Sequence, residues 1–268
     1  MLAKTTILVK NNLRAILRDR VLLAVLGVAL TMILLVPVLS SFSMRQVQEL
    51  AISLSLSTVS GVLLVVTLLL GASSIWRDVE QRYTTSILTL PVSRSTFLLS
   101  KFISIGLFLL LCTAILGVGS AVIIALSSAT YPSEIPIHWH NIFLVLFGDF
   151  LKFLLLAGVA LLLSSVSTSF YLPFFGTLIV YLCGNASQEV YDYATGEFGQ
   201  ELSHLTVKSV TAAYYLIPNL AAFDFQVQAV YGLDVPWTDF LFSLLYALIY
   251  TSILLGLAVF AFGRRQLP

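Results

Sequence analysis

Residues 102–127 read FISIGLFLLLCTAILGVGSAVIIALS, an apolar stretch without a charged side chain. A helix needs about 20 largely apolar residues to cross a membrane, so this stretch alone is long enough to span the hydrocarbon core. The rest of the 268-residue chain has the same character, because hydrophobic residues make up 59% of it and charged residues only 10%. A soluble domain carries about 25% charged residues. The sequence therefore predicts an integral membrane protein.

Uncharged stretches on both sides of this segment predict five further spans. The uncharged run of residues 153–188 is too long for one crossing, and we divide it at the polar cluster of residues 164–169. The expected fold is a single all-α membrane domain, residues 1–268, with six transmembrane helices. Their approximate bounds are 21–43, 51–75, 102–127, 146–166, 169–185 and 240–262.

The distribution of basic residues predicts the orientation of these spans. With six spans both termini lie on one side, and the segments expected on that side contain 11 Lys and Arg residues, against 2 in the opposite loops. Lys and Arg accumulate on the cytoplasmic side of membrane proteins. We therefore expect cytoplasmic termini and a cytoplasmic first loop, residues 76–101. The net charge of only +1 excludes nucleic acid as the main partner.

The N-terminal residues 1–20 predict an amphipathic helix that lies in the membrane interface. Lys10, Arg14 and Arg18 form one basic stripe at helical spacing, beside an apolar face. This pattern is typical of a helix in the headgroup layer, with membrane lipid as its partner. The alternative is that these cations only flank the first span and set its orientation.

The sequence of the first cytoplasmic loop predicts a second amphipathic helix. Apolar residues recur along one helical ridge from Val79 to Leu90, and Pro91 ends the helix. Ser93 or Ser95 is then expected to cap the third span. A simple connection needs only two to eight residues, so this loop predicts a docking surface for another protein. The alternative is a solvated hairpin.

The extracytoplasmic stretch of residues 186–239 alternates acidic and aromatic residues. It is too apolar for a disordered linker and too short for an independent core. We expect short re-entrant helices that dip into the outer membrane interface before the last span begins.

Sequence motifs for catalysis are missing from the chain. No segment matches GxxxxGK[ST], HExxH or GxSxG, so we expect no catalytic residue, metal site or cofactor in this chain. Within the spans the charged residues are Asp149 and Lys152, spaced i, i+3 on the fourth helix. Two interpretations stay open, a structural ion pair or a part of a substrate path. One such pair is too little for a proton-coupled carrier, so energy for transport would come from elsewhere.

The first cytoplasmic loop resembles the coupling helix of ABC-2 type permeases, the type V exporter fold of ABC transporters. The family pattern has an acidic-x-Glu/Arg start, Gly-Thr, Leu-Leu and Pro-x-Ser-Arg, and Thr84 replaces the usual glycine here. The N-terminal helix is similar to the family's elbow helix. Residues 217–224 resemble the re-entrant region before the last span, and residues 263–265 resemble its basic ending. The six-span layout is most similar to the NosY-like and multidrug-type branch.

The resemblance implies a permease subunit that forms a translocation path, in the direction of export, in the inner membrane of a prokaryote. It implies a separate ATPase subunit, which holds ATP and Mg²⁺, and a second permease copy, either identical or a close paralogue. An extracytoplasmic accessory protein is left open. The residues expected to contact the ATPase subunit are Asp78, Glu80, Arg82, Tyr83, Thr84, Ile87, Leu88, Pro91, Ser93 and Arg94.

A membrane anchor or scaffold is the competing function class. Such a protein would recruit a soluble partner without moving a solute, and it explains the charge pattern and the docking loop equally well. The identity of the partner separates the two classes, because only a transporter requires an ATP-binding protein on the 76–101 loop.

Overall fold

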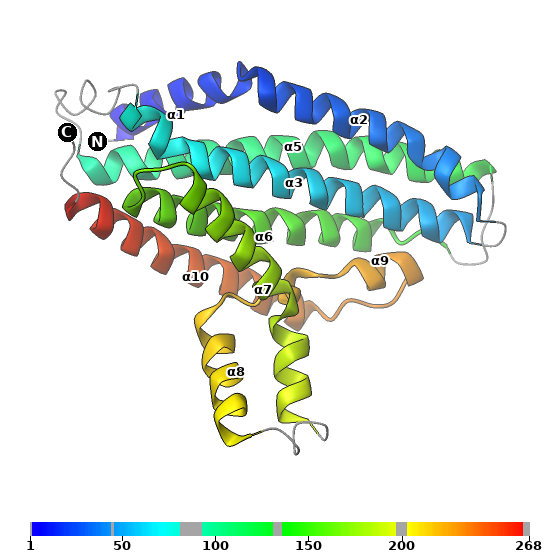
Figure 1. Cartoon of the computed structure of the whole chain (residues 1–268). Coiled ribbons are helices and arrows are strands. Elements are labelled where there is room, and N and C mark those ends of the chain that lie inside the picture. The colour runs from blue at the N-terminus through cyan, green and yellow to red at the C-terminus, as the bar shows by residue number, and fades with distance from the viewer. Residues whose placement is uncertain (1, 44–45, 81–92, 131–135, 197–202, 265–268) are drawn as a thin grey trace.

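The computed structural model describes residues 2–43, 46–80, 93–130, 136–196 and 203–264. Within these ranges the chain is all-helical (Figure 1). The helices are α1 (Leu2–Leu17), α2 (Arg20–Ser41), α3 (Val47–Glu80), α5 (Arg94–Thr130), α6 (Trp139–Val166), α7 (Tyr171–Thr195), α8 (His204–Leu216), the 3₁₀ turn η2 (Ala221–Phe223), α9 (Gln226–Tyr231) and α10 (Trp237–Arg264).

Five of these helices, α2, α3, α5, α6 and α10, are long and apolar enough to cross a membrane. Each overlaps one of the expected spans, which confirms the class of a multi-pass membrane protein. Four of the five are longer than expected, because polar residues at their ends continue the helix beyond the apolar stretch. The clearest case is α5, which begins at Arg94 rather than near residue 102.

The expected span at residues 169–185 differs from the helix observed there. The helix α7 continues to Thr195, and its second half carries Gln188, Glu189 and Asp192. It therefore falls outside the set of five apolar helices, and a sixth span stays a prediction. The end of α7 lies beside α8, where the rings of Tyr191 and Tyr214 stack with centroids 4.3 Å apart. Figure 1 shows α7 and α8 projecting together from the bundle.

The bundle has two distinct ends. Both chain termini lie at the end where α3 stops and α5 starts, which we call the proximal end (Figure 1). We call the opposite end, where α2 stops and α6 starts, the distal end. The segment of residues 217–236, which contains η2 and α9, lies on the distal part of the bundle beside α3 and α6.

The helix α6 forms the centre of the bundle. In its most apolar 18-residue stretch 72% of the residues are buried, against 22% in α2 and in α10. Its closest neighbour is α3, at a point where a side chain at Gly71 would collide with Ala160. Only a glycine permits this separation between the two backbones. The peripheral helices α2 and α10 therefore present most of their apolar surface outward.

The amphipathic character predicted for the N-terminus is present in α1. Its apolar residues Leu8, Leu13 and Ile16 pack against the core. Its basic residues Lys10 and Arg14 are exposed, and so is Arg18, which directly follows its end. Two polar contacts also hold α1 on α5, since Asn12 Nδ2 lies 3.4 Å from Ser100 Oγ and Ser104 Oγ donates to the Val9 carbonyl at 3.3 Å.

Candidate functional site

We call the part of the 76–101 loop between the end of α3 at Glu80 and the start of α5 at Arg94 the candidate docking segment. Asp78 and Glu80 belong to the last turn of α3. The other expected contact residues before Ser93 lie outside the described residues, so their prediction stays untested. They are Arg82, Tyr83, Thr84, Ile87, Leu88 and Pro91.

Ser93 caps the start of α5, as expected. Its Oγ accepts a hydrogen bond from the Thr96 backbone N–H at 3.2 Å. This satisfies one of the backbone donors that the first turn of a helix leaves without an intrahelical partner. The end of the candidate docking segment is therefore held at a defined point of the bundle.

Arg94 turns toward the end of α10. Its Nη1 donates to the Gly263 carbonyl at 2.9 Å and lies 3.5 Å from the Phe262 carbonyl. The last carbonyls of a helix carry partial negative charge and lack intrahelical donors, which explains why a guanidinium binds there. The structure thus gives Arg94 a partner in its own chain, and its expected contact with an ATPase subunit stays a prediction.

An ion pair anchors the other end of the candidate docking segment, at the end of α3. Arg77, near the end of α3, donates from Nη1 to Asp19 Oδ2 at 2.7 Å. Asp19 is also the N-cap of α2, because its Oδ1 accepts from the Val21 backbone N–H at 2.9 Å. The hydrogen bond from Arg77 holds the pKa of the Asp19 carboxyl below its ordinary value. Sequence reasoning missed this pair, although an Asp directly before an apolar run is a recognisable cap signal.

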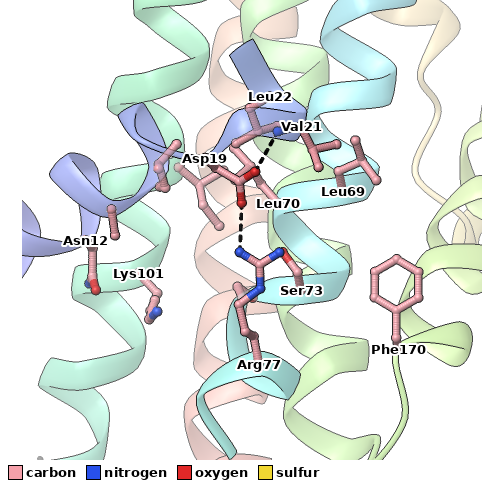
Figure 2. A pocket seen from close by; sticks show the side chains of 14 residues that line it. Asn12, Asp19, Val21, Leu22, Leu69, Leu70, Ser73, Arg77, Lys101 and Phe170 are labelled. Carbon is pink, nitrogen blue, oxygen red and sulfur yellow. Dashed lines mark hydrogen bonds and ion pairs between the residues drawn. The ribbon is translucent and has the colours of Figure 1, made fainter. Parts of the chain in front are cut away.

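A cavity of about 280 Å³ lies beside this ion pair (Figure 2). It is bounded by α1, α2, α3 and α5, with Phe170 from the turn before α7 at one side. Figure 2 shows Asn12 and Lys101 on one side of the Asp19–Arg77 pair and Phe170 on the other. The remaining lining residues are Ala15, Ile16, Val21, Leu22, Leu69, Leu70, Ser73, Ser74 and Ile105.

The two charged residues of α6 are both buried, with 8% of Asp149 and 6% of Lys152 exposed. Asp149 Oδ1 accepts a hydrogen bond from Ser60 Oγ on α3 at 3.2 Å. The Lys152 ammonium lies 5.3 Å from the ring centroid of Tyr181 on α7. Because the two side chains face different neighbouring helices, they form no contact ion pair within the described ranges. The two charges and Asp224 nevertheless act on one another, so a structural role and a place on a substrate path both stay predictions.

Neutral side chains hold the 217–236 segment on the distal part of the bundle. Asn141 of α6 donates to the carbonyls of Gln228 and Leu233 at 3.0 and 2.8 Å. Gln226 Nε2 reaches Ser53 and Ser57 of α3. The sequence offered no signal for these contacts, because each joins residues more than 80 positions apart.

Glycine permits a close approach in this region. A side chain at Gly148 of α6 would place its Cβ 2.8 Å from the Phe223 carbonyl oxygen. Gly232, with φ of 64°, ends α9 in the left-handed conformation that glycine favours. The segment is therefore shaped to its place by backbone contacts as well as by side chains.

Comparison of the sequence with models of known protein families finds no match, and comparison with curated proteins finds none either.

Proposed function

We propose that this chain is the membrane-embedded permease subunit of an ATP-driven transporter. A separate ATPase subunit, which holds ATP and Mg²⁺, docks on the 76–101 loop and drives the bundle between two arrangements. The chain itself contributes no catalytic residue. The resemblance of the loop to an ABC-2 coupling helix and the bundle of apolar helices support this function.

The observation that carries the proposal is that side-chain contacts anchor both ends of the loop to neighbouring helices. The Arg77–Asp19 pair joins the end of α3 to the start of α2. Arg94 joins the start of α5 to the end of α10. A displacement of the docking segment would therefore act on four helices, and not only on the two that the loop connects.

The helices reached through these anchors are the least buried of the five apolar helices. Both α2 and α10 pack against the bundle on one side, while most of their surface faces outward. The central helix α6 has the opposite character. This distribution suits a bundle in which peripheral helices move against a fixed centre.

Asp149 and Lys152 form the polar cluster of α6, and their surroundings favour a role in transport rather than a purely structural ion pair. Asp149 and Lys152 are buried without contact pairing, and buried charges are costly unless hydrogen bonds or other charges compensate them. We assign this cluster to the side of a translocation path that a second permease copy completes. Lipid or the second permease copy would cover the outward apolar faces of α2 and α10. The proposal includes transport in the direction of export and a location in the inner membrane of a prokaryote.

A single substitution in the loop tests the docking. We expect Leu88→Asp to abolish co-purification of the ATPase subunit from native membranes and stimulation of its ATP hydrolysis, because it places a charge on the apolar ridge of the docking helix. The matched control is Leu205→Asp in the first turn of α8, where Leu205 is 78% exposed and the helix dipole tolerates an acid.

Two results would contradict the proposal. If Leu88→Asp retains a stimulated ATPase while the permease reaches the membrane normally, then the loop is not the docking site. If the retained partner is a soluble protein without ATPase activity, then the membrane-anchor alternative replaces the transporter.

A further inference from the structure

The two charged groups in the polar cluster of α6 lack a full set of hydrogen-bond partners. Lys152 is 6% exposed, and its ammonium lies against the ring of Tyr181 with no hydrogen-bond acceptor in the part of the chain that the structure describes. Asp149 accepts a hydrogen bond from Ser60, although a carboxylate has room for about four. Burying such groups is costly unless partners compensate them. A ligand that suits both supplies an anionic acceptor to the lysine and a cationic donor to the aspartate.

A third charge extends this cluster to the surface of the bundle. Asp224 is exposed and acts electrostatically on both charges of α6. Its Oδ1 accepts from the Gln226 backbone N–H at 3.1 Å, and Gln226 Nε2 donates to Ser57 Oγ of α3 at 3.0 Å. Ser57 is exposed and lies one turn before Ser60, the partner of the buried carboxylate. A cationic group beside this part of α3 therefore meets two carboxylates.

The surface of α3 beside the cluster changes from polar to apolar along one stripe. Ser57, Gly61 and Val65 recur every four residues, so they share one helix face, and all three are exposed. No atom lies within 4 Å of a Cβ at Gly61, which leaves open space in the middle of the stripe. An amphiphile with its polar group at the cluster can therefore extend an apolar chain along α3.

We propose that the polar cluster of α6 and Asp224 bind the zwitterionic headgroup of an aminophospholipid, as the transported substrate. The phosphate binds the Lys152 ammonium, the headgroup ammonium donates to Asp149 and Asp224, and an acyl chain follows Gly61 and Val65. Hydrogen bonds between charged groups are the strong ones, so a headgroup with both charges satisfies both sides of the cluster. This inference rests on the proposed function, which places the cluster on a translocation path.

Lipid binding to the full-length protein in a neutral detergent tests the site. The probes are dioleoylphosphatidylethanolamine, which carries a phosphate and an ammonium, and dioleoylphosphatidylglycerol, which carries the phosphate alone. Native mass spectrometry counts the bound lipid. We expect the wild type to prefer the ethanolamine lipid and Asp224→Asn to weaken that preference about fivefold, as the loss of one partly exposed charge pair predicts.

The matched control is Asp234→Asn, which removes another exposed acid of the 217–236 segment. The charge of Asp234 is not among those that act on the α6 cluster, so this variant should keep the preference of the wild type. An unchanged preference in Asp224→Asn, or an equal loss in Asp234→Asn, would overturn the site.

A second variant tests the phosphate contact. Lys152→Gln should weaken the binding of both lipids to a similar extent, because both carry the phosphate. Lys208→Gln, at an exposed position of α8, should leave both unchanged. A loss confined to the ethanolamine lipid in Lys152→Gln would overturn the assigned orientation of the headgroup.

A soluble competitor separates the lipid from a free zwitterion. Glycerophosphoethanolamine carries the same headgroup without acyl chains, and we expect no displacement when it is equimolar with the lipid. Displacement would overturn the lipid assignment, because the ligand would then be a soluble zwitterion. The assay contains no ATPase, so its failure would leave the docking that Leu88→Asp tests unaffected.

Discussion

The two ends of the bundle are held by different kinds of interaction. At the proximal end charged groups make two of the long-range contacts, with Arg77 bound to Asp19 and Arg94 bound to the last carbonyls of α10. At the distal end neutral amides do this work, with Asn141 and Gln226 joining the 217–236 segment to α6 and α3.

This difference separates a region that can rearrange from one that is fixed. Exposed ion pairs contribute little free energy and respond to salt and pH. Half-buried amides that bind backbone carbonyls are insensitive to both, and breaking them leaves polar groups without partners. Contacts at the proximal end are therefore expected to respond more strongly to salt and pH than those at the distal end.

The largest effect is expected at the close contact between α6 and the 217–236 segment. Gly148→Val would force its new side chain against the Phe223 carbonyl, and we expect a loss of about 3 kcal/mol in the free energy of unfolding. Thermal unfolding in detergent measures it. The control is Gly61→Val, since no atom lies within 4 Å of a Cβ at Gly61. Equal stability of the two variants would show that the 217–236 segment shifts freely, and the distal end would not be fixed.

A smaller loss is expected when a distal amide is removed. Asn141→Leu leaves the carbonyls of Gln228 and Leu233 without their donor, which should cost about 1–2 kcal/mol. Asn185→Leu is the matched control, because Asn185 donates to the Tyr181 carbonyl of its own helix. Comparable losses in chemical unfolding would show that the contact between segments contributes nothing beyond helix formation.

The smallest effect, and one that depends on pH, is expected at the proximal ion pair. Because the folded pKa of Asp19 is lowered, its contribution is present above the unfolded pKa of about 3.9 and is lost as the pH falls through the folded value. Arg77→Gln should therefore reduce stability at pH 7 by at most about 1 kcal/mol, with the difference disappearing at lower pH and shrinking in 1 M salt. Unfolding curves from pH 7 to pH 2 measure this.

The reciprocal variant sharpens the same comparison. Asp19→Asn keeps a good N-cap for α2 but removes the charge. In that background Arg77→Gln should cost nothing further, so a persistent, pH-independent loss would show that Arg77 stabilises the protein through packing.

Features that depend on local sequence were predictable. The apolar character and approximate position of five spans, the amphipathic α1 and the Ser93 cap each follow from residues a few positions apart. The failures involve distant partners. The extension of α7 is accompanied by stacking of Tyr191 on Tyr214. The spacing of Asp149 and Lys152 did not indicate their neighbours Ser60 on α3 and Tyr181 on α7.

By itself the sequence determined the class of protein. Placing polar groups in hydrocarbon costs free energy, so the segments that cross a membrane must be long apolar stretches, which the sequence shows directly. Tertiary structure alone decided which polar side chains meet. Arg94 and Gly263 lie 169 positions apart, and Arg77 and Asp19 lie 58 apart. Helix periodicity relates residues only within a few turns, so contacts over such separations exist only after the helices have packed.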